Sequence, residues 1–435
     1  MSGPRAIPRV ALEIAAAPRV RRALTVAVFG SSFAAGFLRA FWGWPGTIAV
    51  LAALVAMCAL SLAGARGTID WRGILPISLL ALGGWVALST LLSQYTTVTV
   101  LAILATAGYA FLGVYVALAR DLIQTVRSLG DALRAVLVVS LVLEVLAGIL
   151  LDMPFPFLGI EGDLAVGGPI QGIFGDRNQL GFVAGLAFLT FWVETRTRSV
   201  SRVVGIGSLV LAGLMVILSG SPVTVGVLLV VGGVGLVLLA LRRIPLGSRP
   251  VVQTVFFALL VVAVIVVALL RSRVFALLDA TSDFDARVAL WMRIRDWASL
   301  HAVEGWGWVG AWPDGQLPYS ALSGPGSAPV DSALNAYVDA WLQIGLVGAA
   351  LLIGALALGF VRAWLVASSS RITVDVWPAL TLTLLAVTSL AESYLLVEGG
   401  LVVFVAACIA AARRRSWRGL LRDPGVDEGL PRRGA

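Results

Sequence analysis

DSALNAYVDAWLQIGLVGAALLIGALALGFV, residues 331–361, starts with polar side chains and continues into an apolar run long enough to cross a bilayer. Four polar residues recur there at every fourth position: Asp331, Asn335, Asp339 and Gln343. On a helix this spacing places them along one slowly drifting stripe. Helix capping by Asp331 and hydrogen bonds within a helix bundle would account for the stripe, but polar residues in a membrane helix also mark functional sites.

The apolar character extends over the whole chain of 435 residues, which is 59% hydrophobic and 13% charged, with a mean hydropathy of +0.96. A soluble protein of this length needs a larger share of polar residues to cover its surface. The two cysteines, Cys58 and Cys408, lie inside apolar runs, which excludes a disulfide framework and a CxxC site. A single histidine, His301, excludes a histidine-rich metal centre. The composition therefore predicts a membrane protein that crosses the bilayer many times.

Apolar runs separated by Arg, Gly, Pro or Ser residues predict the number of membrane helices. Twelve such runs occur, at about 23–41, 46–64, 74–93, 97–119, 134–151, 178–194, 203–219, 222–241, 251–270, 335–361, 376–392 and 398–412. Backbone groups cannot stay unpaired in lipid, so each run is expected to be helical. The predicted fold class is an all-α polytopic membrane protein with about 12 transmembrane helices and a large extracytoplasmic loop.

The distribution of arginine predicts which side of the membrane each connection faces. With the N-terminus in the cytoplasm, 25 of the 32 basic residues, all of them arginine, fall on the cytoplasmic side, as the positive-inside rule requires. The formal charge of +8 therefore reflects topology and does not indicate nucleic acid binding. The expected segments are a cytoplasmic tail (1–22), nine helices (23–270) with an extracytoplasmic loop (152–177), a large extracytoplasmic loop (271–334), three helices (335–412) and a cytoplasmic tail (413–435).

The large loop contains TSDFDARVALWMRIRDWASL, residues 281–300, which is typical of an amphipathic helix at the membrane interface. On a helical wheel Arg287 lies at the centre of the apolar face, close to Trp291 and Ile294. An arginine on that face is costly unless it meets an anion. Two hypotheses stay open: a structural role, as an ion pair with a loop carboxylate or by snorkelling, and a guanidinium fork that binds a phosphate.

GIFGDRNQLG, residues 172–181, ends the first long loop and starts a helix. Glycines, Arg177 and a helix N-terminus on the outer face together form a candidate anion site. Asn178 is expected to cap this helix or to hydrogen-bond across the bundle. The alternative for Arg177 is a simple ion pair with Asp176 where the chain enters the membrane.

The remaining candidates are aromatic or acidic. HAVEGWGWVGAWPDG, residues 301–315, places Trp306 and two further tryptophans among glycines, which suits either interface anchoring or stacking on sugar rings. Glu144 lies inside a predicted span, and carboxylates at such depth are by default functional candidates. Glu392 lies near the expected outer surface, where solvent would stabilise its charge.

Three stretches, in this order, resemble motifs of the O-antigen ligase and polymerase superfamily: GIFGDRNQLGFVAGLAF, ARVALWMRIRDWASLHAVEGWGWVG and LNAYVDAWLQIGLVG. The last is similar to the family's His-Asn, nine residues, Gly-x-x-Gly, with Asn335, Gly345 and Gly348 in register. The resemblance implies an inverting, metal-independent glycosyltransferase at the outer side of the cytoplasmic (inner) membrane, working in polysaccharide biosynthesis of the cell envelope. It would move a glycan from undecaprenyl diphosphate, a polyprenyl diphosphate, to a cell-envelope acceptor, with no cofactor.

The resemblance also assigns roles to residues. Arg287 matches the family's arginine, and Arg177 is the second candidate for holding the diphosphate. The family's catalytic histidine is replaced by Leu334, and Pro222 stands where the family often has an arginine after Ser-x-Ser. Leucine accepts no proton, so Asp331 becomes the nearest titratable replacement.

The predicted site therefore combines catalytic and substrate-binding residues: Arg287, Asp331 and Asn335 for catalysis, and Arg177, Asn178, Trp291, Trp306 and Asp339 for substrate binding, with no metal. Ligase and polymerase share these motifs, so both stay open. A secondary transporter or flippase is the alternative from another class, and Glu144 is the feature that favours it most. A catalytically inactive scaffold follows as a further alternative from Leu334.

Overall fold

The computed structural model describes residues 9–67, 75–249, 251–256, 258, 262, 281–313, 315–322 and 330–414. These residues form helices and connecting turns, and the one β-type pairing among them is an isolated bridge between Phe155 and Ile160. The span predicted at 251–270 lies largely outside the described residues, and all of 271–280 and 323–329 lie outside them.

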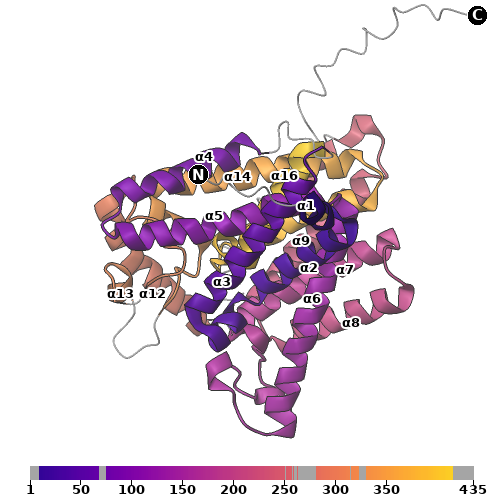
Figure 1. The fold of residues 1–435 in the computed structure, drawn as a ribbon. Coiled ribbons are helices and arrows are strands. Elements are labelled where there is room, and N and C mark those ends of the chain that lie inside the picture. Colours follow the sequence, from indigo (N-terminus) through magenta and orange to yellow (C-terminus); the bar gives the residue numbers. More distant parts are fainter. Residues whose placement is uncertain are drawn as a thin grey trace, which may run out of the picture.

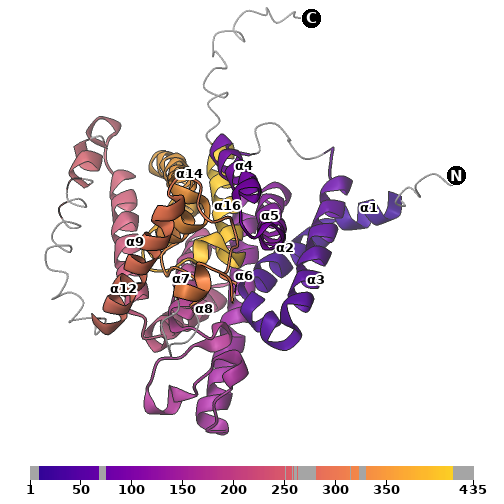
Figure 2. The same cartoon turned by 90° about the vertical axis from the view of Figure 1, so that its left-hand side faces the viewer.

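The helices are named in chain order. They are α1 (Arg9–Ala16), α2 (Pro18–Phe33), α3 (Ala35–Gly64), α4 (Ile77–Leu92), α5 (Thr96–Ala119), α6 (Leu122–Val145), α7 (Arg177–Thr197), α8 (Arg202–Leu218), α9 (Pro222–Leu241), α12 (Thr281–Ala298), α13 (Tyr319–Leu322), α14 (Ala336–Ser369), α15 (Trp377–Thr388) and α16 (Glu398–Arg414). A π-helical turn, Leu146–Leu150, extends α6. Figure 1 shows these helices packed into one bundle, and Figure 2 shows α9 and α12 on one side of it and α1 and α3 on the other.

Five of the described helices are long and apolar enough to cross a membrane: Ala35–Gly64, Thr96–Ala119, Leu122–Leu150, Pro222–Leu241 and Ala336–Ser369. Three shorter apolar helices, Ile77–Leu92, Arg202–Leu218 and Thr373–Thr388, lie between them in the sequence. The prediction of an all-α membrane protein with several spans is confirmed. The count of twelve stays a prediction.

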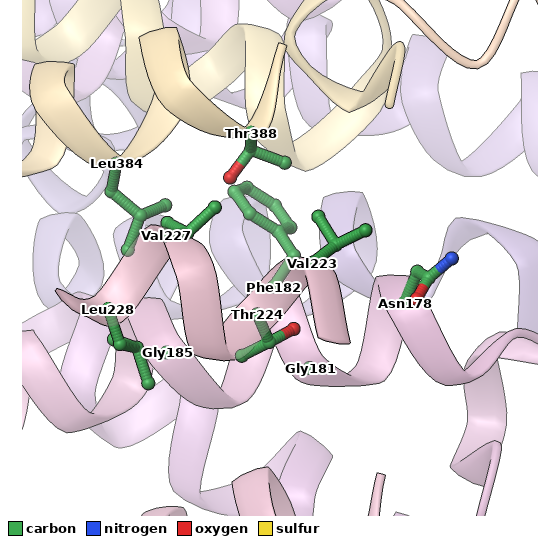
Figure 3. A pocket seen from close by; sticks show the side chains of 10 residues that line it. All are labelled: Asn178, Gly181, Phe182, Gly185, Val223, Thr224, Val227, Leu228, Leu384 and Thr388. Atoms are coloured by element: carbon green, nitrogen blue, oxygen red, sulfur yellow. The ribbon is translucent and has the colours of Figure 1, made fainter. Parts of the chain in front are cut away.

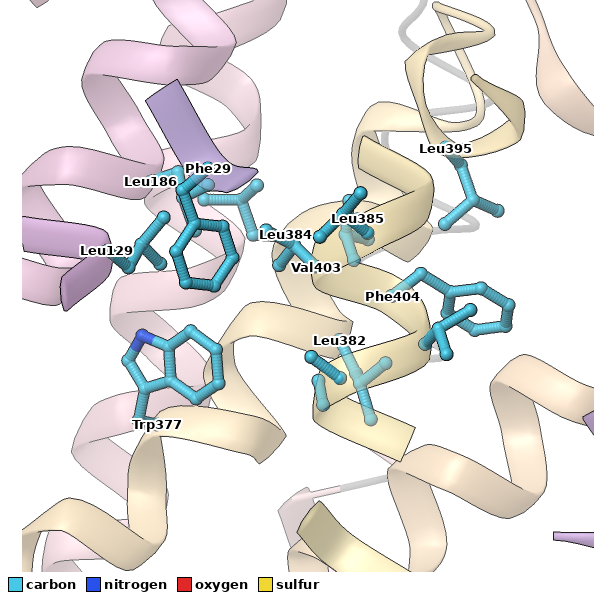
Figure 4. Close-up of a cluster of buried hydrophobic side chains, with 14 of the residues drawn as sticks. Phe29, Leu129, Leu186, Trp377, Leu382, Leu384, Leu385, Leu395, Val403 and Phe404 are labelled. Atoms are coloured by element: carbon cyan, nitrogen blue, oxygen red, sulfur yellow. The ribbon is translucent and has the colours of Figure 1, made fainter. Parts of the chain in front are cut away.

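The core is a continuous set of apolar side chains shared by helices that are distant in the sequence. Trp377 at the start of α15 is fully buried and lies near Phe29 of α2 and Leu129 of α6 (Figure 4). Small residues let the helices approach closely: a Cβ at Gly113 would meet the backbone oxygen of Val402 at 2.8 Å. Close packing of this kind is the main source of helix association in lipid, where the hydrophobic effect between helices is absent.

Helix α14 is broken, which differs from the continuous span expected for residues 335–361. Ile344 and Gly345 leave the helical conformation, and Gly345 has a φ of +68°. The chain after α12 fills the break, because Leu346 N donates to Ala302 O at 2.9 Å and a Cβ at Gly345 would lie 2.0 Å from Val303 O. Only glycine combines this positive φ with such close backbone contact. The break therefore fixes the segment after α12 against the first turns of α14.

The beginning of α14 also differs from the expectation. Asn335 is the N-cap, and its side chain accepts from Tyr337 N and Val338 N. Asp331 lies four residues earlier, outside the helix, so the interpretation of Asp331 as the helix cap is wrong. The polar stripe is not one helical face, because its first member precedes the helix and Gln343 adjoins the break.

Two helix boundaries differ from prediction in ways that matter for the site. Helix α6 starts at Leu122, twelve residues before the predicted span, because Asp121 caps it by accepting from Gln124 N. Helix α15 ends at Thr388, so Glu392 lies in the turn between α15 and α16. An apolar run shows which residues are hydrophobic enough for lipid or for the protein core. It does not show at which residue a helix begins or ends.

Glu144, the acidic residue inside α6, holds the following loop in place. It is fully buried, and its Oε1 accepts from Gln171 N at 2.8 Å and from Gly172 N at 2.6 Å. These bonds satisfy two backbone donors that would otherwise be buried without partners. The structure therefore gives Glu144 an architectural contact, which weakens the main sequence argument for a transporter.

Candidate functional site

Arg287 of α12 is the centre of a polar cluster formed by segments far apart in the sequence. Its Nη2 donates to Glu392 Oε1 at 2.8 Å, across 105 residues of sequence. Its Nη1 donates to the backbone oxygens of Leu334, at 3.3 Å, and Ala391. The side chains of Arg287 and Glu392 are 12% and 2% exposed, so the ion pair is largely shielded from water.

The sequence of α12 explains why Arg287 points inward. Leu290, Ile294 and Ala298 share its face of the helix and are buried, whereas Arg293 and Arg295 are exposed. Packing of the apolar face thus carries Arg287 into the bundle. Of the two hypotheses for Arg287, the ion pair with a loop carboxylate is what the structure shows, and the carboxylate is Glu392.

Asn178 of α7 extends the cluster to two further helices. Its Nδ2 donates to Glu392 Oε1 at 2.9 Å, and its Oδ1 accepts from Ser221 Oγ at 2.7 Å. Ser221 is the N-cap of α9, so the starts of two helices meet at this amide. The prediction that Asn178 hydrogen-bonds across the bundle is confirmed by these two contacts.

A second carboxylate lies beside the cluster. Asp176 caps α7 by accepting from Asn178 N at 3.1 Å and Gln179 N at 3.0 Å, and it also accepts from the hydroxyl of Tyr394. Arg177 is the first residue of α7 and is half-buried. Arg177 thus precedes Asn178 at the start of α7.

The electrostatics of Glu392 are set by three neighbours with opposing effects. Burial raises the pKa of its carboxyl to about 7, which the positive charge of Arg287 opposes and the negative charge of Asp176 reinforces. The hydrogen bonds from Arg287 and Tyr394 also stabilise the charged form. Glu392 is therefore poised to change protonation near neutral pH.

Asn335 and Leu334 connect α14 to the same cluster. Asn335 Nδ2 donates to Leu390 O at 3.0 Å, which ties the start of α14 to the turn that carries Glu392. Leu334 has a φ of +50°, a conformation that is strained for leucine, and its carbonyl points at Arg287. The backbone of Leu334 therefore lies directly beside the guanidinium.

Asp331 and Trp291 flank this cluster. Asp331 is in part open to solvent, and its backbone oxygen accepts from Trp312 N at 2.9 Å. Desolvation by the surrounding protein, as the largest cause, and the charge of Asp176 raise the pKa of the Asp331 carboxyl. Trp291 Nε1 donates to Ala333 O at 2.9 Å, and its ring packs against Phe284.

Two predicted substrate-binding residues lie in the interior. Asp339 is buried and accepts from Trp312 Nε1 and Gln343 Nε2, both at 2.8 Å. Trp306 is also buried, with its Nε1 donating to Trp297 O at 3.1 Å and its ring against His301. Protein encloses both side chains in this conformation, and the substrate contacts predicted for them stay predictions.

A groove runs between α7, α9 and α15 (Figure 3). It is lined by Asn178, Gly181, Phe182, Gly185, Val223, Thr224, Val227, Leu228, Leu384 and Thr388. Its lining is mainly apolar, and its polar end is Asn178, the residue that holds Glu392. The groove and the Arg287 cluster are therefore neighbours that share one residue.

Within the described residues, no three His, Cys, Asp or Glu side chains converge as a metal site would require. The cluster around Arg287 offers hydrogen-bond donors and one cation, which suits an anion.

Glu392, Ser221 and Tyr394 are the cluster residues that the sequence did not predict. The sequence predicts that Glu392 lies near the outer surface, where solvent would stabilise its charge, whereas the structure buries it. Burial of a carboxylate requires a partner, and the inward-facing Arg287 lacked one in the sequence. The signal in the sequence is the inward-facing Arg287, which requires an anion but does not identify the carboxylate that provides it.

Comparison with known protein families agrees with the motifs. A family model for O-antigen ligase matches residues 207–353, a range that includes α12 with Arg287, the Leu334–Asn335 step and the broken part of α14. Asn178 and Glu392 lie outside the matched range. None of the curated proteins matches the chain. The match over residues 207–353 supports the resemblance of this membrane protein to the O-antigen ligase superfamily.

Proposed function

We propose that the protein transfers a glycan from a polyprenyl diphosphate carrier to an acceptor at the outer face of the cytoplasmic membrane. The observation that carries this proposal is the position of Arg287, which lies inside the O-antigen ligase domain and projects into a buried cluster of polar groups. A guanidinium binds phosphate oxygens through a planar fork of donors, which no other side chain provides.

The reaction requires the protein to stabilise the charge on the leaving group and to accept a proton from the acceptor. The acceptor hydroxyl attacks the anomeric carbon from the face opposite the carrier, the bond between that carbon and the diphosphate oxygen breaks, and the configuration inverts. Negative charge grows on the leaving diphosphate, where Arg287 stabilises it. The hydroxyl proton passes to a base.

The groove between α7, α9 and α15 supports a lipid-linked donor. A polyprenyl diphosphate joins an apolar chain to an anionic head, and the groove joins an apolar lining to the cluster that contains Arg287. The apolar groove thus suits the apolar chain of the donor, and the Arg287 cluster suits its anionic head. The groove is the place where we expect the first isoprenoid units to lie.

Asp331 is the proposed base, because Leu334 cannot accept a proton. It is in part open to solvent next to the start of α14, and its raised pKa makes the carboxylate a stronger base. Asp331→Asn should lower the rate of transfer about 100-fold, within the range for a lost general base. Initial rates with donor and acceptor saturating would measure this, and a rate within twofold of the wild type would exclude Asp331 as the base.

The proposal is tested with the purified full chain in liposomes that contain a polyprenyl-diphosphate-linked glycan and an acceptor polysaccharide. Transfer is expected from the wild type and from Arg295→Ala, whose side chain is exposed on the same helix. Arg287→Ala should lose transfer. Equal transfer by the two variants, or none by the wild type over a panel of cell-envelope acceptors, would refute the proposal.

Two other functions remain as alternatives with their own readouts. A polymerase of the same superfamily would use a second lipid-linked glycan as acceptor, and products of increasing length would identify it. A transporter or flippase gains support from the break in α14, since broken helices commonly form transport sites. Here the protein's own loop occupies that break, and counterflow of the lipid-linked glycan without transfer would be the result that favours transport.

A further inference from the structure

We propose that Glu392 occupies the phosphate-binding face of Arg287 when no donor is bound, and that donor binding moves Arg287 to the diphosphate and a proton to Glu392. This inference rests on the proposed function, since it concerns how the same site receives its donor. It adds Glu392 to Arg287 as a residue whose state changes when the anionic donor binds. It also predicts that the affinity for the donor depends on pH.

The contacts of Arg287 show that both terminal nitrogens of its guanidinium are already in use. One terminal nitrogen faces the Glu392 carboxylate, and the other faces the backbone oxygens of Leu334 and Ala391. A carboxylate and a phosphate present similar pairs of oxygens to a guanidinium. An incoming diphosphate therefore competes with Glu392 for Nη2 of Arg287 and with the two backbone oxygens for Nη1.

The charges around Glu392 decide what happens when Arg287 leaves. The groups that face this carboxyl are Arg287 from α12, Asp176 before α7, Tyr394 on its own turn and the neutral Asn178. Without Arg287, the described contacts leave a nearly buried carboxylate beside a second carboxylate. The arriving diphosphate adds more negative charge. A carboxyl in such surroundings becomes neutral by binding a proton.

The rest of the cluster tolerates this exchange without rearrangement. Asn178 Nδ2 can still donate to the carbonyl oxygen of a neutral Glu392, because that oxygen remains an acceptor. Ser221 Oγ holds the other end of the Asn178 amide and does not depend on the charge of Glu392. The Arg287 side chain changes partners, and the backbone oxygens of Leu334 and Ala391 lose its Nη1 as a donor. The proton comes from solvent, so one proton is taken up for each donor bound.

The pH dependence follows from this coupling. Without donor the pKa of Glu392 is about 7, and with donor it is higher because Arg287 has left and a diphosphate has arrived. Below pH 7 the carboxyl is already protonated in the free protein, so affinity changes little. Above pH 7 the proton must be taken up on binding, so affinity falls by up to about tenfold per pH unit.

The experiment measures binding of undecaprenyl diphosphate without sugar to the purified full chain in detergent micelles between pH 6 and 9. For the wild type, the dissociation constant should rise about tenfold or more from pH 7 to 8.5. Glu392→Gln should bind with less than about twofold change over that interval, and more tightly than the wild type at pH 8.5. Glu398→Gln is the matched control, because Glu398 pairs with Arg39 outside the cluster.

Calorimetry of the wild type in two buffers of different ionisation enthalpy gives a second measurement that needs no variant. Uptake approaching one proton per diphosphate at pH 8 is expected. Binding without proton uptake, or a pH dependence that Glu392→Gln retains, would overturn this inference and leave the proposed function intact. A wild type that binds undecaprenyl diphosphate no better than the alcohol undecaprenol would overturn both.

Discussion

Glu144 and Glu392 are both buried carboxylates, yet their partners are of different kinds. Glu144 accepts from two backbone N–H groups of the loop that follows its own helix. Glu392 accepts from the side chains of Arg287 and Asn178, which come from two distant helices. Backbone donors are fixed features of the fold, whereas an arginine side chain can exchange one anion for another. A structural carboxylate therefore differs from a carboxylate in a functional site more by the mobility of its hydrogen-bond partner than by how deeply it is buried.

The largest effect on stability is expected at Glu144. Glu144→Ala leaves the N–H groups of Gln171 and Gly172 buried without an acceptor, which should lower the free energy of unfolding by about 2–6 kcal/mol. Glu144→Gln keeps one acceptor oxygen and should cost less. Thermal unfolding in detergent measures both.

Glycan transfer by Glu144→Gln completes this test of the comparison. Transfer near the wild-type rate is expected, because the side chain serves the loop and not the reaction. A stable Glu144→Gln protein that has lost transfer would place Glu144 in the site, and the comparison would then fail.

A smaller effect is expected at Glu392, and it depends on pH. The pKa of Glu392 rises from its ordinary value of 4.5 to about 7 on folding, so the folded state holds a proton more tightly than the unfolded state. The stability from this proton is complete below pH 4.5 and is lost as the pH rises to about 7, by at most about 3 kcal/mol.

Unfolding of the wild type and of Glu392→Gln, compared from pH 4.5 to 8, isolates this contribution. The difference in stability between the two proteins should change across pH 4.5–7 in favour of Glu392→Gln and should level off above pH 7. A difference that stays constant with pH would show that the Glu392 carboxyl has the same pKa in the folded and the unfolded state. Glu392 would then not differ from an ordinary carboxyl in its titration.

The smallest effect is expected in the groove. A Cβ at Gly185 would lie 3.4 Å from Leu228 and 3.9 Å from Leu384, so Gly185→Leu should fill the groove and weaken binding of undecaprenyl diphosphate about tenfold. Gly226→Leu on α9 is the control, because a Cβ there meets no atom within 4 Å. Equal affinities for the two variants would show that the lipid chain lies elsewhere.

How much the sequence could predict follows from what each pattern records. The wheel of residues 281–300 correctly turned Arg287 inward, because the periodicity of one helix records which of its faces is buried. It could not identify Glu392, since the facing turn is 105 residues away and the sequence carries no record of that proximity.

The break in α14 could not be predicted for a related reason. The sequence shows Gly345 only as part of a motif, but its conformation depends on the backbone of Val303 lying against it. Asn335 caps α14 and donates to Leu390 O, which the sequence does not show, and its catalytic role stays a prediction. A membrane-span pattern reports hydropathy and is insensitive to local backbone contacts.

The central claim is that Arg287 holds the diphosphate of a lipid-linked glycan, and its most direct test is made in the native host. Arg287→Ala and Arg295→Ala should be introduced at the chromosomal locus, and envelope glycan and polyprenyl-linked intermediates should be quantified in both strains. The account predicts that Arg287→Ala reduces transfer about 100-fold or more and accumulates carrier-linked glycan, while Arg295→Ala resembles the wild type. Normal envelope glycan without accumulated intermediate in a strain that produces stable Arg287→Ala protein would contradict it.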